Sequence, residues 1–171
     1  MNVKFGTDGI RGRAGSLPCT VEVAVAVGRA AARLAQQCGD PRVVVGRDTR
    51  PSGPMLANAV LSGIAAQGAT AHDVGVLPTS GVGVAVANGL ASTGVMVTAS
   101  HNSWPDNGFK VLGAGGYKLD DQSNETVEAW INEEPTPAEP GTIVDVSGRA
   151  RADYFAALTD ALSHRHVLAG R

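Results

Sequence analysis

Short apolar runs and longer alanine-rich segments alternate along most of this chain. Valine-rich runs too short for a helix predict β-strands, and apolar residues spaced three and four positions apart predict helices. The predicted strands cover residues 42–46, 70–76, 94–98 and 109–112. The predicted helices cover residues 20–38, 52–67, 78–88, 120–132 and 149–162. Strands that alternate with helices indicate an α/β layered fold.

Several residues mark where these helices begin and end. Thr20 is a suitable N-cap for the first helix, and Gly39 is a suitable stop after it. Asp120 stands at the start of the helix that begins there, where the helix dipole favours a negative charge. The boundaries of these two helices are therefore predicted from single residues as well as from periodicity.

Length and composition indicate one domain of ordinary size followed by an extension. The chain has 171 residues, of which 43% are hydrophobic and 18% charged. We expect a domain over residues 1–132, a linker over 133–148 and a further helical segment over 149–171. Three prolines between residues 133 and 141 support the linker.

The distribution of charge favours small anions as ligands. Up to Lys118 there are ten lysines and arginines against six acidic residues, a net charge of +4, although the whole chain carries −2. The basic part contains no run of lysine and arginine of the kind that follows a nucleic-acid backbone, so no nucleic-acid partner is expected. Phosphate groups are the expected partners.

Apolar segments and cysteines indicate a cytoplasmic protein without a membrane partner. The most apolar stretch, residues 21–35, contains three charged side chains, and the first seven residues contain no apolar signal-peptide core. Cys19 and Cys38 are not spaced as a redox or zinc motif, so both are expected to be reduced and buried.

Three polar loops carry the candidate chemistry, and two of them have simpler interpretations. Residues 5–12 place Thr7 and Arg11 among glycines, where backbone and guanidinium can approach an anion. The alternative is a glycine-rich turn with a surface arginine. Residues 46–53, with Arg47 and Asp48, join a strand to a helix whose N-terminus could bind an anion. The alternative is an Arg47–Asp48 ion pair followed by a Ser52 cap.

The third loop, residues 98–110, is the most informative. Ser100 offers a hydroxyl that can carry a phosphoryl group, His101 offers an imidazole that can carry a proton, and Lys110 can neutralise a phosphate. The alternative is a structural turn held by serine and asparagine side chains. The sequence contains no P-loop, dinucleotide-binding or nucleophile-elbow motif, so these classes of site are not predicted.

Four motifs in this order resemble the first domain of the α-D-phosphohexomutases. They are FGTDGIRG at residues 5–12, GRDTRPSG at 46–53, TASHN at 98–102 and NGFK at 107–110. The opening motif is most similar to the phosphoglucosamine mutase branch, rather than to the phosphomannomutase/phosphoglucomutase branch. The resemblance implies a three-layer α/β/α domain with a mixed, mostly parallel sheet.

The resemblance also implies a reaction and a role for each candidate residue. Glucosamine 6-phosphate and glucosamine 1-phosphate would be interconverted through a phosphoserine, which matches Ser100. Ser100 would also supply one ligand, through its phosphate, to Mg²⁺. Lys110 and Arg11 would assist the transfer. The remaining candidates for binding the phosphate groups of a hexosamine phosphate are Thr7, Arg47, His101 and Asn102, the last two also shaping the loop.

Two departures from the family pattern limit this interpretation. Ser103 stands where the family usually has proline, which is expected to loosen the loop modestly. The sequence contains no Asp-Gly-Asp metal motif, so we expect a first domain that lacks full activity alone and is open to self-association through apolar surface. The alternatives are a phosphomannomutase/phosphoglucomutase domain and a non-catalytic module that binds sugar phosphates or another protein.

Overall fold

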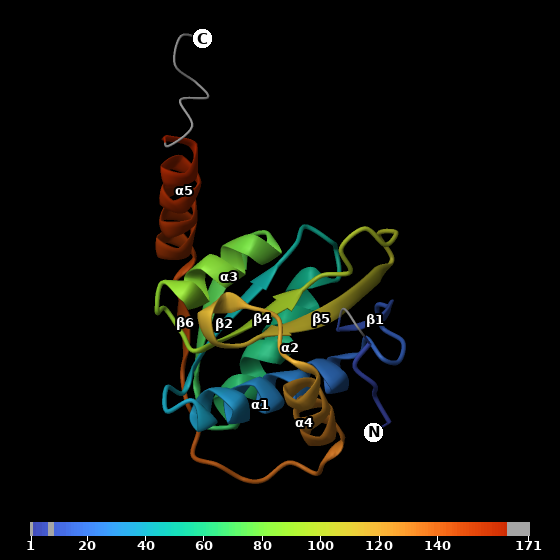
Figure 1. Ribbon diagram of the computed structural model, residues 1–171. Coiled ribbons are helices and arrows are strands. Elements are labelled where there is room, and N and C mark those ends of the chain that lie inside the picture. Colours follow the sequence, from blue (N-terminus) through green and yellow to red (C-terminus); the bar gives the residue numbers. More distant parts are fainter. Residues whose placement is uncertain (1, 7–8, 164–171) are drawn as a thin grey trace.

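The computed structural model describes residues 2–6 and 9–163, and these form one central sheet covered by helices (Figure 1). Within the described residues, the sheet has six strands in the order β1-β5-β4-β2-β3-β6. The strands are β1 (Ile10–Arg13), β2 (Arg42–Arg47), β3 (Thr70–Val76), β4 (Thr93–Val97), β5 (Asp106–Leu112) and β6 (Ile143–Asp145). The helices are α1 (Val21–Gln37), α2 (Gly53–Ala66), α3 (Thr79–Ala87), the 3-10 turn η1 (Ala114–Gly116), α4 (Asp121–Asn132) and α5 (Ser147–Ser163).

The sheet is mixed and mostly parallel, as expected. Strands β4, β2, β3 and β6 run parallel to one another, whereas β5 is antiparallel to both β4 and β1. The carboxyl ends of β2, β3 and β4 therefore lie at one edge of the sheet, which is where ligands collect in folds of this type.

Two separate hydrophobic cores show that the fold has three layers. Alternate side chains of the buried strands face opposite sides, so Val43 and Val45 pack toward α1 and α2, whereas Val44 packs toward α3. Helix α4 joins the α1 side, and α5 joins the α3 side through Ala150. The predicted α/β/α arrangement is confirmed.

Most predicted elements agree with the structure to within two residues, and both predicted ends of the first helix are confirmed. The Thr20 hydroxyl accepts a hydrogen bond from the N–H of Val23, and Gly39 has a φ of 75°. The Asp120 carboxylate accepts from the N–H of Ser123 at 2.7 Å, and this bond lowers the pKa of Asp120. Local signals thus set these helix ends.

Two strands and one exposure differ from the sequence prediction. Strands β1 and β6 were not predicted, and β5 begins at Asp106 rather than at residue 109. These segments are short or glycine-containing, and only pairing with a neighbouring strand makes them extended. The prediction that both cysteines are buried is wrong, because Cys38 lies at the exposed C-terminal end of α1 whereas Cys19 is buried.

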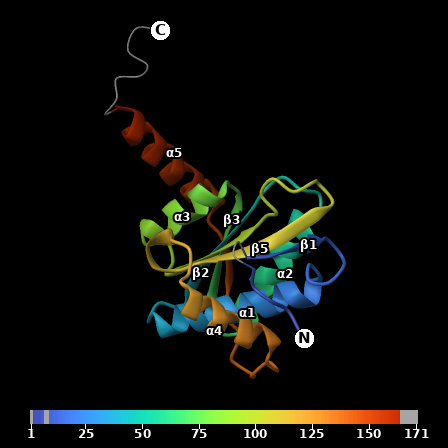
Figure 2. The same cartoon turned by 45° about the vertical axis from the view of Figure 1, so that its right-hand side comes forward.

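The segment after α4 returns to the sheet and adds its outermost strand beside β3, at the side away from β1. Strand β6, which lies within the expected linker 133–148, pairs with β3, and α5 then points away from the body of the domain (Figure 2). Phe155, Leu158 and Leu162 on α5 are exposed. The C-terminal part of the expected segment 149–171, residues 164–171, lies outside the described residues. No helix in the described part is long and apolar enough to span a membrane.

Candidate functional site

Ser100 lies in the loop between β4 and β5, three residues after the end of β4. Its side chain is exposed, and its φ of 58° places it in the left-handed region that serine rarely adopts. Such a conformation costs about 1–3 kcal/mol and persists only where surrounding contacts hold it. Those contacts are what define the site.

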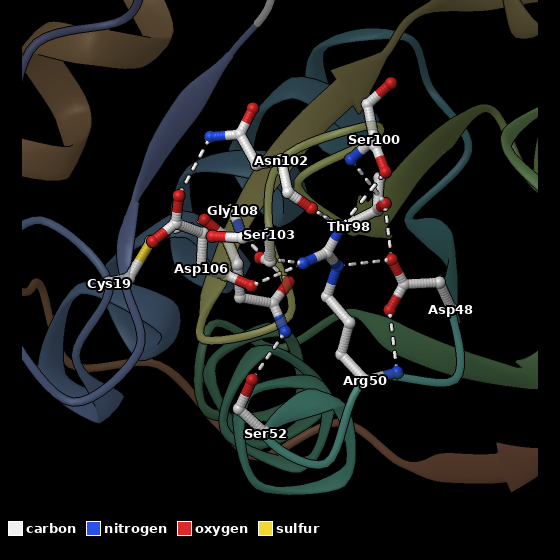
Figure 3. Close-up of polar contacts among 11 residues, drawn as sticks. Cys19, Asp48, Arg50, Ser52, Thr98, Ser100, Asn102, Ser103, Asp106 and Gly108 are labelled. Atoms are coloured by element: carbon white, nitrogen blue, oxygen red, sulfur yellow. Dashed lines mark hydrogen bonds and ion pairs between the residues drawn. The ribbon is translucent and has the colours of Figure 1, made fainter.

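Arg50, in the loop after β2, binds the loop between β4 and β5 that contains Ser100, which we call the serine loop; Arg50 lies below it in Figure 3. Its Nη1 donates to the carbonyl oxygens of Ser103 at 2.6 Å and Asp106 at 3.0 Å. Its Nη2 donates to the carbonyl oxygens of Ser100 at 3.0 Å and Asn102 at 2.8 Å. Because Nε also donates to the Asp48 carboxylate, the guanidinium makes five hydrogen bonds, as many as it has N–H donors.

Asp48 connects Arg50, which binds the carbonyl of Ser100, to the N–H of the same serine through Thr98. Its Oδ2 accepts from Arg50 Nε at 3.0 Å and from the hydroxyl of Thr98 at 2.6 Å. The Thr98 hydroxyl oxygen in turn accepts from the N–H of Ser100 at 2.9 Å. The N–H and the carbonyl of Ser100 are therefore both tied, through different side chains, to one carboxylate oxygen.

A buried asparagine anchors the far end of the loop. Asn107 is fully buried, donates from Nδ2 to the Ser52 hydroxyl at 2.9 Å, and accepts at Oδ1 from the N–H of Gly108. The thiol of Cys19 donates to the Asn107 carbonyl at 3.1 Å. Burial raises the pKa of Cys19 to about 11, so the protonated thiol that makes this bond is the form present at neutral pH.

Arg11 and Lys110 share one face of the sheet beside this edge. Arg11 on β1 pairs with Gly108 on β5, and Lys110 lies two residues after Gly108, on the same face of the sheet. Phe109, between them, is buried on the other face. A Cβ at position 108 would collide with the carbonyl oxygen of Ile10, so glycine permits the close pairing of β1 with β5. Lys110 also lines a pocket of about 270 Å³ with Thr79 and Lys118.

The other candidate residues differ in how they relate to the serine loop. Asn102 donates from Nδ2 to the Asp106 carboxylate at 3.0 Å and so shapes the loop. His101 is exposed, and no side-chain hydrogen bond holds it within the described residues. Arg47 packs its side chain against Gly53 at the start of α2. Thr7 lies outside the described residues.

The structure corrects the alternative interpretation of the loop after β2. Asp48 forms its ion pair with Arg50 and not with Arg47. Ser52 precedes α2, but its side chain makes no capping hydrogen bond and instead accepts from Asn107. Sequence reasoning missed Arg50. The signal available was a second arginine two residues after Asp48, but only the tertiary structure shows which carbonyl groups it reaches.

The described residues alone do not form a cation site. Among residues 2–6 and 9–163, no group of three or more His, Cys, Asp or Glu side chains gathers as a metal centre requires. This part of the chain offers an exposed serine in the loop after β4 and two cationic side chains, Arg11 and Lys110, on one face of the neighbouring strands β1 and β5.

The layered α/β/α sheet and its serine loop belong to a domain class found in sugar-phosphate mutases, as comparison with known proteins shows. Residues 2–138 match the family described as "Phosphoglucomutase/phosphomannomutase, alpha/beta/alpha domain I", and the chain belongs to that family. A putative phosphomannomutase from Thermus thermophilus has a similar structure, with a TM-score of 0.79 and 29% identity over 94% of this chain and 36% of that one.

The curated relatives that the chain matches include phosphoglucosamine mutases. The chain is 46% identical to a phosphoglucosamine mutase of Cereibacter sphaeroides over 86% of its length, covering 32% of that protein. It is 47% identical to one of Mycolicibacterium vanbaalenii over 82% of its length, covering 33% of that protein. The chain thus spans about a third of the length of these relatives.

Proposed function

We propose that this chain is the phosphoryl-carrying part of a phosphoglucosamine mutase, with Ser100 as the carrier. The phosphoryl group on Ser100 Oγ passes to the 1-hydroxyl of glucosamine 6-phosphate, giving a sugar phosphorylated at positions 1 and 6. The phosphoryl group at the other position then returns to Oγ and leaves glucosamine 1-phosphate. Each transfer breaks one P–O bond and forms another, and the proton of the attacking hydroxyl ends on the hydroxyl released.

The observation that carries this proposal is the way the loop presents Ser100. Its hydroxyl is exposed while both of its backbone polar groups are hydrogen-bonded. A nucleophile held in one orientation avoids much of the entropic cost of reaching an in-line geometry. The names of the relatives at 44–47% identity support glucosamine phosphate as the substrate.

Arg11 and Lys110 are proposed to balance the charge of the carrier. A phosphoserine has a charge of about −1.5 to −2 near neutral pH. Two cations on the sheet face beside the loop can stabilise that charge and the charge that develops during transfer. Arg47, His101, Asn102 and Thr7 remain proposed contacts for substrate phosphate groups.

A metal ion is proposed to take one ligand from this chain. Mg²⁺ prefers several oxygen ligands, and a phosphate oxygen on Ser100 would be one of them. When bound, it would lower the charge barrier to phosphoryl transfer. The described residues do not gather three or more further His, Cys, Asp or Glu ligands for such an ion.

A domain exchange tests the carrier role. Residues 2–138 would replace the matching segment of the Cereibacter sphaeroides enzyme, and conversion of glucosamine 6-phosphate to glucosamine 1-phosphate would be measured. The unmodified graft is expected to turn over, and Ser100→Ala to abolish turnover. Ser103→Ala is the matched control, because Ser103 is an exposed serine of the same loop that contributes only its carbonyl. Equal activity of the two variants would contradict the proposal.

A further inference from the structure

We infer that Arg50 is a positioning residue for the serine carrier, acting directly on the carbonyl of Ser100 and, through Asp48 and Thr98, on its N–H. This inference rests on the proposed function for its catalytic consequence, but its structural part stands on contacts within the described residues. None of the three side chains is among the candidate catalytic residues.

The guanidinium of Arg50 holds the loop by donating hydrogen bonds to four of its carbonyl oxygens. Its four N–H bonds to the loop reach residues spread over seven positions, from Ser100 to Asp106. The Arg50 side chain is only 10% exposed, and its bonds to Asn102 and Asp106 are partly buried, whereas those to Ser100 and Ser103 lie at the surface. Charge-assisted hydrogen bonds of this kind are about twice as strong as neutral ones.

Arg50 is suited to position the loop rather than to bind substrate. Its five hydrogen bonds match its five donors, so a phosphate would have to displace a loop carbonyl to bind it. Asp48 offsets its charge at 3.0 Å. The loop can therefore keep one conformation whether or not Ser100 carries a phosphoryl group, which lets the same hydroxyl serve both transfers.

Thr98 completes the arrangement from the other side of Ser100. The hydroxyl of Thr98 donates to Asp48 and accepts from the Ser100 N–H, so it relays the position of the carboxylate to the serine backbone. Thr98 is 5% exposed, which keeps this relay away from competing water. Asp48 Oδ2 thus fixes both sides of a serine whose φ is 58°.

Amide hydrogen exchange of the full 171-residue chain tests the structural part. Arg50→Lys keeps the charge but has three donors in place of five, and it is expected to speed exchange at Ser100, Asn102 and Asp106 about tenfold. Exchange in β4 is expected to stay within about twofold, since a local loss of contacts opens only the loop. Arg42→Lys is the matched control, because Arg42 also pairs with an aspartate two residues before it.

Thr98→Val is a second variant that separates the two sides of the arrangement. It removes the relay to the Ser100 N–H and leaves the bonds of Arg50 to Asn102, Ser103 and Asp106. Faster exchange at Ser100 with little change at Asp106 is expected. The inference is overturned if Arg50→Lys behaves like Arg42→Lys, if it loosens β4 as much as the loop, or if Thr98→Val leaves Ser100 unchanged.

Kinetics in the grafted enzyme test the catalytic consequence. Arg50→Lys is expected to lower kcat about 100-fold, as misplacement of a reacting group by about 1 Å can do, with less than about a threefold change in KM. A fall in binding with unchanged kcat would overturn the positioning role. Turnover that survives Ser100→Ala would instead remove the proposed function, while the exchange results would still stand.

Discussion

Strand β2 has an aspartate and an arginine, two residues apart, at each of its ends. Asp40 and Arg42 mark the start of the strand, and Asp48 and Arg50 follow its end. In both pairs the arginine Nε donates to a carboxylate oxygen, at 2.6 Å and 3.0 Å respectively. The Arg42 side chain is 44% exposed and that of Arg50 10%, so the same local pattern lies in two different environments.

What surrounds each arginine decides what the pair does. Arg42 makes a second hydrogen bond to Asp40, and together these bonds keep the pKa of Asp40 below its usual value. Arg50 directs its other donors to carbonyl groups of the β4–β5 loop. One pair is a surface contact, and the other connects two loops at the edge where the candidate site lies. Sequence spacing alone therefore does not assign a role to an ion pair.

The largest difference is expected when each aspartate is removed. Asp48→Ala leaves a largely buried guanidinium without its counter-charge and should lower the free energy of unfolding by about 3 kcal/mol. Asp40→Ala removes an exposed pair and should cost less than about 1 kcal/mol. Urea denaturation of both variants measures this difference. Equal losses would mean that the two pairs are energetically alike.

Replacing each arginine by lysine should give a smaller difference of the same sign. Lysine cannot replace the five directed bonds of Arg50, so Arg50→Lys should lower the free energy of unfolding by about 2 kcal/mol. Arg42→Lys should change it by less than about 0.5 kcal/mol, since exposed pairs contribute little. Thermal and urea unfolding report both values, and a costly Arg42→Lys would break the comparison.

The titration of His72 should show that only the first pair is electrically coupled to it. Burial lowers the pKa of His72 below 6.5, and the charge of Asp40 acts in the opposite direction. Asp40→Asn should therefore lower this pKa further, whereas Asp48→Asn should leave it unchanged. An NMR titration of the imidazole measures both, and a shift with Asp48→Asn would contradict the expected independence.

The lowered pKa of His72 makes the free energy of unfolding depend on pH. Below pH 6.5 the unfolded chain binds this proton more readily than the folded one. Neutral His72 therefore contributes its full share to the free energy of unfolding above pH 6.5. This share is lost as the pH falls from 6.5 through the lower pKa of His72 in the folded state. Unfolding measured between about pH 7.5 and about pH 5 should show this loss in the parent chain and not in a His72→Gln variant.

Salt should separate the pairs by the smallest margin. The Debye length falls from about 10 Å at 0.1 M to about 3 Å at 1 M ionic strength, and exposed charges are screened more than buried ones. A double-mutant cycle at the first pair should lose most of its coupling energy at about 1 M NaCl. The cycle at Asp48 and Arg50 should keep most of its coupling, and an equal loss in both would contradict their different burial.

Elements with strong local signals could be predicted, and those that depend on distant partners could not. The helix that begins after Thr20 and the strand at residues 70–76 follow from periodicity and capping residues. Strand β1 has only four residues with an internal glycine, and it becomes extended because β5 pairs with it. Strand β6 likewise exists because β3 offers it an unpaired edge.

The candidate site divides in the same way. The roles proposed for Ser100, Arg11 and Lys110 come from residue types and from the order of the four motifs. The roles of Arg50 and Asn107 could not, because each acts on atoms contributed by a distant segment: Arg50 reaches residues 50 to 56 positions away, and Asn107 reaches Ser52. Carbonyl groups are present at every residue, so no sequence pattern shows which of them an arginine will bind.

The layered α/β class, the helix ends and the residues proposed to carry or neutralise a phosphoryl group could all be predicted from the amino-acid sequence. These depend on periodicity, side-chain chemistry and local capping, all of which act within a few residues. Only the tertiary structure decided which arginine pairs with Asp48 and how Ser100 is held with a positive φ. Both depend on two loops meeting where parallel strands end, because hydrogen bonds extend about 3 Å in space whatever their separation along the chain.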